Sequence, residues 1–385
     1  MIKEVASYLY KGGFSFLMLC LALVLNHRTG YITLIGIFSI IVFFSYTVRE
    51  KIDKGGLVIL LYTTVYILFS FLNGFPYTFS TLILYAVAPF IFYQYGKIIV
   101  RNFSSETFII TSLLLIVFCY CVDIYYTLLQ GIIESGQLLG FNRKFSLSGD
   151  SENMLSATLV GLSMNIGMIG LPMTILIKNK ILKLSFFSLF IMSIITTFSL
   201  LNRTGIAVAL FCFFGIMSYK SRFNLRYIVY SFIFIVLIVL GLSYLEILNT
   251  DLLEIYAERN NDISTMGSRT DRWSEALKSL LVSPAGWESS GKVYYVHNMW
   301  LDIARISGII PFSLLVYMAF DCFMKAFKII KINESNLGYM LLGLNICFFL
   351  SCFVEPIFGG THFMLYCLVW GVECAVLRNK EVLYS

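Results

Sequence analysis

Charged side chains are scarce in this chain of 385 residues, and their scarcity excludes a large class of proteins. Asp, Glu, Lys and Arg make up only 13% of the sequence, whereas soluble globular proteins carry about 25%. Apolar residues reach 58%. A water-soluble fold of this length is therefore excluded. The composition predicts a membrane protein with many spanning segments, contained in a single membrane domain over residues 1–385.

Several chemical signatures are absent as well. The sequence has no HExxH zinc motif, no GxSxG nucleophile elbow and no P-loop, which excludes the enzymes that depend on them. It also lacks a CxxC pair, and its nine cysteines lie in or beside apolar runs. These thiols are expected to pack between helices, with no metal site and no disulfide framework. The net charge of +6 does not indicate nucleic acid, because the basic residues are scattered between apolar runs.

The apolar runs predict an all-α fold of transmembrane helices. Each run is apolar around the whole helix for about 15 to 26 residues, whereas barrel strands would alternate apolar and polar residues. About twelve such runs are present. They lie near residues 9–26, 31–48, 55–73, 78–96, 108–129, 154–177, 184–202, 204–219, 227–245, 299–324, 336–354 and 363–377.

The distribution of cations predicts the orientation of these spans. Most of the 28 Lys and Arg residues fall in alternate connections, which identifies those connections as cytoplasmic. Both termini are then cytoplasmic, and the first span is a retained helix and not a signal peptide. Two polar segments remain on the outer side, at 130–153 and 246–298. The second is the larger, and a functional site is expected there and at the outer helix ends.

The large outer segment contains a predicted amphipathic helix. Ser268 and Asp271 form a capping-box pattern at its start, and Pro284 and Gly286 close it. Its apolar positions recur with helical spacing and predict one stripe that packs against the spans, formed by Trp273, Ala276, Leu277, Leu280 and Leu281.

Two arginines lie at the start of this helix. Arg269 occupies the first helical position and Arg272 the fourth, so the two are neighbours on one face. A cation at a helix N-terminus interacts unfavourably with the helix macrodipole. A bound anion such as a diphosphate would offset this cost, because the arginines and the free N–H groups could bind it together. The alternative is that Arg272 pairs with Asp271 or Glu275 on a solvated face.

Five other polar residues are candidates for the site. Arg203 lies between two apolar runs on the outer side, where it either snorkels to the interface or faces a polar cavity. His297 precedes a helix near the outer surface and is either an interfacial residue or a general base. Asp123 lies near the outer end of its span. Glu355 and His362 flank the last outer turn and either line the site or only form the turn.

Three short motifs resemble those of a known family. His297-Asn298, nine residues and then Gly308 resemble a signature of bacterial O-antigen ligases and of O-antigen and capsule polymerases. Arg203-Thr204-Gly205 is similar to that family's earlier motif. A third pattern is similar to the family's large loop, and it consists of Gly267-Ser268-Arg269, Trp273, Ala276-Leu277, Pro284 and Gly286. The resemblance covers about residues 190–320. The chain departs from the family pattern at two places. Pro311 stands where the family usually has a small residue, Thr or Tyr, and Ala285-Gly286-Trp287 reproduces a Gly-x-Gly stretch only in part.

This resemblance implies a membrane-embedded glycosyltransferase of the C type in the bacterial inner membrane. Its donor would be an undecaprenyl-diphosphate-linked glycan, and transfer to a sugar hydroxyl would occur on the outer face, with inversion and without metal or cofactor. The resemblance also implies that Arg203 and Arg269 neutralise the diphosphate and that His297 activates the acceptor. Arg272 would support them. The candidate substrate-binding residues are Asn298, Asp123, Glu355 and His362.

Two questions stay open at this point. The acceptor is either another lipid-linked repeat unit, for a polymerase, or lipid A–core or a protein, for a ligase. We favour the polymerase because such enzymes serve more surface-polysaccharide systems. The alternative from another class is a flippase for the same lipid-linked glycans. Transporters usually contain internal repeats with broken helices near the bilayer midplane, whereas here the polar residues gather outside the spans.

Overall fold

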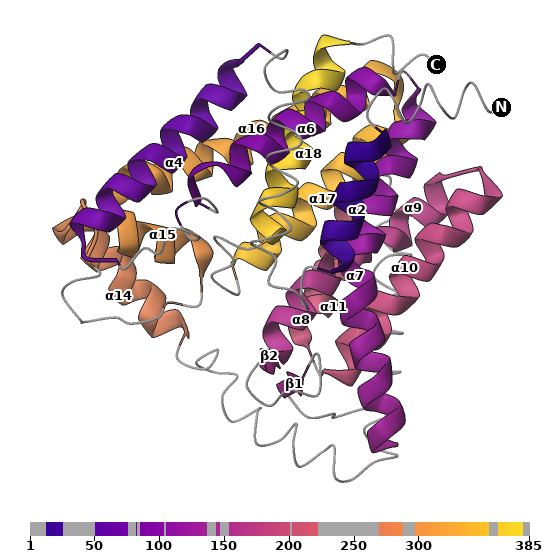
Figure 1. Cartoon of the computed structure of the whole chain (residues 1–385), viewed down its shortest axis with the longest axis horizontal. Coiled ribbons are helices and arrows are strands. Elements are labelled where there is room, and N and C mark those ends of the chain that lie inside the picture. The colour runs from indigo at the N-terminus through magenta and orange to yellow at the C-terminus, as the bar shows by residue number, and fades with distance from the viewer. Residues whose placement is uncertain are drawn as a thin grey trace.

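The chain folds as an assembly of α-helices in the computed structural model (Figure 1). In the described part, one short antiparallel strand pair, β1 (Lys144–Ser146) with β2 (Met154–Ser156), interrupts the helical pattern. The structure describes residues 13–25, 51–75, 82, 85–103, 105–136, 144–146, 154–200, 202–221, 269–287, 296, 298–353 and 361–379.

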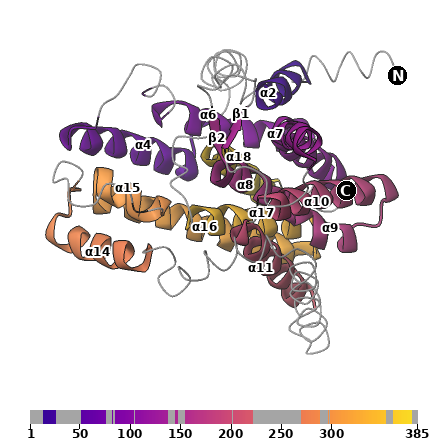
Figure 2. The same ribbon diagram turned by 90° about the horizontal axis from the view of Figure 1, so that it is seen from below.

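The helices form two groups around a shared centre (Figures 1 and 2). α4, α14, α15 and α16 lie on one side, α7 to α11 lie on the other, and α17 and α18 lie between them. The bounds are α2 (Phe14–Val24), α4 (Lys54–Leu72), α6 (Ala88–Asn102), α7 (Glu106–Ser135), α8 (Ala157–Asn165), η3 (Ile166–Ile169), α9 (Gly170–Leu176), α10 (Lys180–Ser199), α11 (Arg203–Lys220), α14 (Arg269–Val282), α15 (Met299–Ser307), α16 (Ile309–Asn333), α17 (Asn336–Cys352) and α18 (Thr361–Arg378).

Four helices in the described part are long and apolar enough to cross a membrane. They are Lys54–Leu72, Glu106–Ile133, Lys180–Ser199 and Ile309–Ile332. Their lengths and composition are those of a membrane protein. The predicted spans at 31–48 and 227–245 lie outside the described residues, so the number of crossings stays a prediction.

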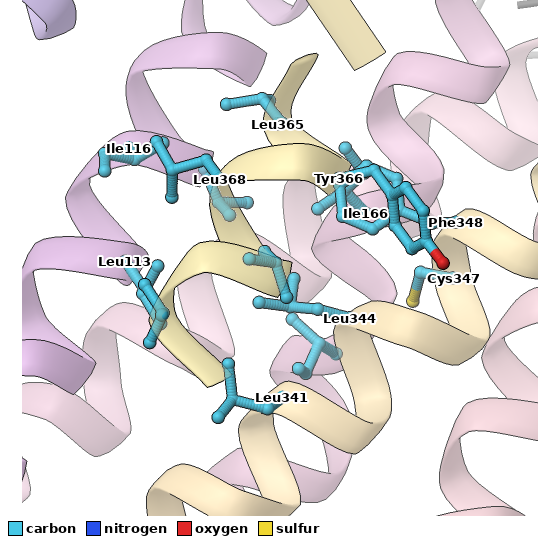
Figure 3. Close-up of a cluster of buried hydrophobic side chains, with 14 of the residues drawn as sticks. Leu113, Ile116, Ile166, Leu341, Leu344, Cys347, Phe348, Leu365, Tyr366 and Leu368 are labelled. Atoms are coloured by element: carbon cyan, nitrogen blue, oxygen red, sulfur yellow. The ribbon is translucent and has the colours of Figure 1, made fainter. Parts of the chain in front are cut away.

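The buried centre is apolar and joins the two groups (Figure 3). Leucines and isoleucines of α7, η3, α17 and α18 pack together there, among them Leu113, Ile166, Leu344 and Leu368. All nine cysteines lie in the described part, and none forms a disulfide. Seven of them are buried, which confirms the expectation that the thiols pack between helices.

α6 and α18 approach each other backbone to backbone. A Cβ atom on Gly96 would collide with the carbonyl oxygen of Leu368, and one on Gly371 would collide with the carbonyl oxygen of Tyr93. No side chain fits at either contact. Small residues at a helix interface permit this closeness in a membrane, where packing and hydrogen bonds drive association.

An ion cluster around the buried Asp53 ties three helix ends together. Asp53 caps α4 by accepting from the Gly56 N–H (2.9 Å), and it also accepts from the Tyr93 hydroxyl (2.8 Å). The Lys97 ammonium of α6 and the Arg378 guanidinium of α18 lie 3.6 and 3.1 Å from its other oxygen. We call Asp53, Tyr93, Lys97 and Arg378 the clasp.

The charge state of Asp53 follows from these contacts. Burial acts to raise its pKa, but the hydrogen bonds from Gly56 and Tyr93 and the charges of Lys97 and Arg378 outweigh burial and lower the pKa below its usual value. The Asp53 carboxylate is therefore an anion that its neighbours stabilise.

Three sequence expectations need correction. The run 299–324 is not one span, because α15 ends at Ser307 and α16 begins at Ile309. The run 154–177 is divided into α8, η3 and α9, with a 3₁₀ turn between the two α-helices. The segment 130–153 is partly regular, since α7 continues to Ser135 and β1 follows.

Candidate functional site

The helix predicted within residues 246–298 is present, and it begins where expected. α14 starts at Arg269, with Arg272 as its fourth residue, and ends at Val282 before Pro284. The predicted cap residue, Ser268, lies outside the described residues. The helix therefore holds the two arginines of the motif within its first turn.

One face of α14 packs in a small apolar cluster and fixes the helix against α15. The cluster contains Ala276, Leu280, Trp287, Val296, Leu301 and Ala304. The predicted single stripe is wrong in one respect, because Leu277 and Leu281 are exposed and do not join this cluster. They lie next to the packed face, and α15 covers only part of the apolar surface of α14.

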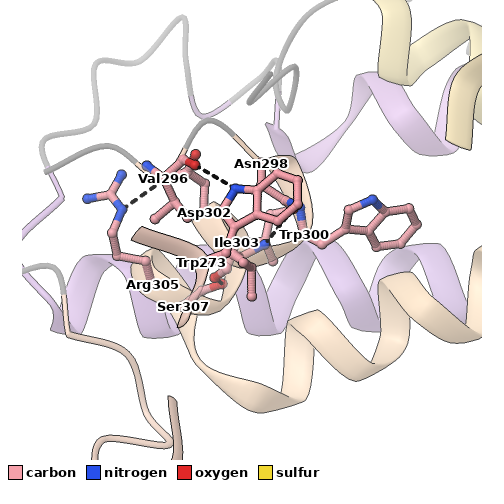
Figure 4. A network of polar contacts seen from close by, with 9 residues as sticks. Trp273, Val296, Asn298, Trp300, Asp302, Ile303, Arg305 and Ser307 are labelled. Atoms are coloured by element: carbon pink, nitrogen blue, oxygen red, sulfur yellow. Dashed lines mark hydrogen bonds and ion pairs between the residues drawn. The ribbon is translucent and has the colours of Figure 1, made fainter. Parts of the chain in front are cut away.

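A hydrogen bond links α14 to the residue before His297. The Trp273 indole Nε1 donates to the Val296 carbonyl at 3.0 Å, and the Val296 N–H donates to the Asp302 Oδ1 at 3.4 Å (Figure 4). Two helices therefore satisfy both polar backbone groups of this buried residue. His297 lies outside the described residues, but both of its neighbours are fixed.

Asn298 has a structural role on the other side of His297. It is buried, and its Oδ1 accepts from the N–H groups of Trp300 (3.0 Å) and Leu301 (3.2 Å). Asn is among the residues most favoured at this N-cap position. The His-Asn motif is thus a helix start, with His297 immediately before the cap.

An ion pair inside α15 was not among the sequence candidates. The Arg305 Nε donates to the Asp302 Oδ1 at 2.9 Å, and both side chains are buried. The i, i+3 spacing behind an Asn cap could have indicated the pair, but spacing alone does not distinguish a buried pair from an exposed one. Because Asp302 also accepts from Val296, the pair stiffens the segment around His297.

Two glycines shape the two turns that follow α14 and α15. Gly286 has φ +107°, and the following N–H, that of Trp287, donates to the Arg305 carbonyl at 2.8 Å. Gly308 has φ +83° and ψ −172°, a conformation essentially restricted to glycine. A Cβ on Gly308 would collide with the Pro284 carbonyl oxygen. Three residues of the family-like pattern, Pro284, Gly286 and Gly308, therefore meet where these two turns touch.

The end of α4 anchors both turns. The Asn73 Nδ2 donates to the carbonyls of Ala285 (2.7 Å) and Ile306 (3.1 Å). α4 therefore has the clasp at one end and these two turns at the other. We call the described residues 269–287, 296 and 298–308 the platform.

The Arg203 motif forms a tight corner between two other helices. α11 begins at Arg203, and the Asn202 Oδ1 caps it by accepting from the Thr204 N–H at 3.1 Å. A Cβ on Gly205 would collide with the Thr197 hydroxyl, so glycine lets α11 approach α10 this closely. The motif is a compact helix start with Arg203 at its first residue.

His362 lies in an apolar pocket beside α15. It is buried, and neither ring nitrogen has a hydrogen-bond partner among the described residues. Its ring centroid is 4.7 Å from that of Phe348 and 6.3 Å from that of Tyr120. Met299 and Trp300 also line this pocket. The structure therefore brings His362 close to the helix that Asn298 caps.

The remaining candidates are divided between the platform and more distant parts of the molecule. Arg272 is half-buried on α14. Asp123 is buried on α7, one turn along from Tyr120, whose ring lies 6.3 Å from that of His362. Glu355 lies outside the described residues, as do the side chains of Arg203 and Arg269. Within the described part, no group of three or more His, Cys, Asp or Glu residues is arranged to hold a metal ion.

Comparison with known protein families and with curated proteins found no match. The functional interpretation therefore depends on the motifs and on the geometry that surrounds them.

Proposed function

We propose that this chain is a membrane glycosyltransferase that polymerises O-antigen or capsular glycan from undecaprenyl-diphosphate-linked units. One observation carries the proposal. Trp273, on the helix that begins with Arg269, is hydrogen-bonded at 3.0 Å to the residue that precedes His297. This contact joins the arginine motif to the histidine motif, and a shared reaction centre requires groups that are held in a defined relative position.

In the proposed reaction, a hydroxyl oxygen of the acceptor sugar attacks the anomeric carbon of the donor. A new glycosidic bond forms as the bond to the diphosphate breaks, and His297 takes the hydroxyl proton. Arg203 and Arg269 neutralise the departing diphosphate, a stabilisation that is strongest where water is excluded. Attack from the face opposite the diphosphate inverts the anomeric centre.

The other candidates would act in substrate binding. Arg272 lies one turn along α14 and would add positive charge near the diphosphate. His362, in the pocket that Met299 and Trp300 also line, would contact the acceptor side of the substrate. Asp123 and Glu355 would contact sugar hydroxyls. Asn298 would act mainly by capping α15, since its Oδ1 already accepts two N–H groups.

Glycan extension by the purified protein in proteoliposomes tests the proposal. With an undecaprenyl-diphosphate-linked repeat unit as the single substrate, a polymerase yields longer lipid-linked chains. Arg269→Lys should remove most of the product, because an ammonium group does not reproduce the two-pronged contact of a guanidinium with phosphate. Lys278→Arg, at an exposed position of the same helix, is the matched control and should keep full activity. Binding of the substrate without any extension would favour a flippase.

Gene deletion followed by gel analysis of the surface glycan separates polymerase from ligase. Loss of long chains, with one repeat unit still attached to lipid A–core, indicates a polymerase. Long chains that accumulate on undecaprenyl diphosphate and never reach lipid A–core indicate a ligase and contradict the proposed acceptor.

A further inference from the structure

α14 has an apolar surface that the platform does not use. Ala276 and Leu280 are buried against α15, with exposed fractions of 0% and 6%. Leu277 and Leu281, one position further round the helix, are exposed by 51% and 82%. The apolar residues of α14 before its last position therefore divide between a packed face and an open one, while Val282, the last residue, is exposed on the side of Glu275.

The open face lies between the packed face and a polar face. Successive residues are 100° apart around a helix, so Leu277 and Leu281 lie side by side next to Ala276 and Leu280. Glu275, two positions before Leu277, is exposed and points to a different side of the helix. α14 thus has an apolar edge and a polar edge, which is the pattern of a helix that lies in a membrane interface.

The end of α14 that carries Leu281 lies beside the start of a candidate membrane span. The Ile309 N–H, at the start of α16, donates to the Pro284 carbonyl at 2.8 Å, which places the end of α14 beside the beginning of α16. α16 is one of the helices long and apolar enough to cross a membrane. One face of it is exposed and apolar along its length, through Ile309, Ile310, Val316, Tyr317, Phe320 and Met324.

We infer that Leu277 and Leu281 insert into the acyl chains of the lipid leaflet in which α16 begins. The occupant of the open face is phospholipid, because the neighbouring apolar face of α16 contacts lipid when that helix spans the bilayer. α14 lies beside α15 at one end of the molecule, as an interfacial helix does (Figures 1 and 2). The leaflet would then set the height of Arg269, at the other end of α14, relative to the phosphate groups of the lipids.

Tryptophan quenching in nanodiscs with one chain per disc tests this inference. Leu281→Trp and its control Glu275→Trp are compared with the wild-type chain in ordinary phospholipid and in phospholipid brominated in the upper half of the acyl chains. We expect bromine to remove about half of the emission added at position 281 and little of that added at position 275. Leu277→Trp gives the same comparison if Leu281→Trp does not fold.

Equal emission at position 281 in both lipids overturns the inference. A dimer in detergent that Leu281→Asp dissociates would then identify a second copy of the chain as the occupant of the open face. The quenching measurement needs no transferase activity, so its outcome is independent of the proposed function.

Discussion

The clasp and the platform are polar assemblies at opposite ends of α4, and they differ in how they are built. In the clasp, one carboxylate is contacted by groups of three helices, and the residues involved are far apart in the sequence. In the platform, the ion pair is local, within α15, and glycine turns bring backbone groups together. The clasp joins long helices to each other, whereas the platform holds a short motif in place.

This difference indicates a division of labour. A carboxylate surrounded by partners on separate helices has no capacity left for a ligand. The platform instead fixes the residues on both sides of His297 through Trp273 and Asn298, and these contacts do not involve the histidine side chain. We therefore expect changes in the platform to affect activity before stability, and changes in the clasp to do the reverse.

Replacing His297 gives the largest expected effect. His297→Ala should lower glycan transfer about a thousandfold, because a positioned general base contributes about 10²–10⁴ in rate. The measurement is extension of the lipid-linked repeat unit in proteoliposomes, with protein abundance in the membrane determined in parallel. A fall in abundance equal to the fall in activity would show that His297 serves folding, and the division of labour would not hold.

Gly308→Ala should have the next largest effect. The new Cβ would meet the Pro284 carbonyl oxygen in a backbone conformation that costs about 1–3 kcal/mol for other residues. We expect a lower unfolding temperature in detergent together with a loss of activity.

The matched control for Gly308 is Gly136→Ala. Gly136 also has a positive φ, +66°, but nothing lies within 4 Å of its Cβ position. Gly136→Ala should lower the free energy of unfolding by only about 1–2 kcal/mol. Equal unfolding temperatures for the two variants would contradict the close turn that we describe.

Asp53→Asn breaks the clasp and should lower the free energy of unfolding by about 2 kcal/mol, while activity per folded molecule is unchanged.

The carboxyl group of Asp53 also predicts that the stability difference between the native chain and Asp53→Asn depends on pH. The pKa of Asp53 is lowered in the folded chain. Its contribution to the free energy of unfolding is therefore complete above its pKa in the unfolded chain, about 3.9, and is lost as the pH falls through its pKa in the folded chain. The unfolding temperatures of the two proteins should therefore converge as the pH falls below about 4. If the two unfolding temperatures differed by the same amount at all pH values, the charge of Asp53 would not be the cause of its stabilising effect.

The smallest effect is expected from two matched tryptophan variants. Trp273→Phe loses the hydrogen bond to the Val296 carbonyl, and Trp370→Phe loses the one to the Asp321 carboxylate at 2.8 Å. Each should cost about 1–2 kcal/mol of stability. Only Trp273→Phe should lower transfer, by several-fold, because only it loosens the segment before His297. Equal activities would mean that the Trp273 contact does not position the site.

The sequence was sufficient for elements whose signals are local. Apolar runs predicted α4, α10 and α17 within a few residues, and the capping pattern predicted the start of α14 at Arg269. These features depend on side chains within one or two turns of each other. The same is true of the Asn298 cap, whose partners lie two and three residues away.

Features that depend on distant contacts could not be predicted in this way. The break at Gly308 is held by a hydrogen bond to Pro284 and, through Ile306, by Asn73, which is far away in the sequence. The division of the apolar residues of α14 depends on which side α15 occupies. The clasp combines Asp53 with Arg378, which the sequence places near opposite ends of the chain. In each case the hydrophobic periodicity of the sequence identifies which face of a helix is apolar, but it does not identify the element that packs against that face.

The glycine contacts between α6 and α18 also limit how the protein changes shape. With carbonyl oxygens occupying the space where side chains of Gly96 and Gly371 would begin, the two backbones have no room to rotate or slide past each other. This pair is therefore a stationary axis of the molecule. In the proposed transferase, an opening for a sugar chain would therefore come from helices other than this pair. Labels that report on helix separation should stay constant between α6 and α18 throughout a reaction cycle.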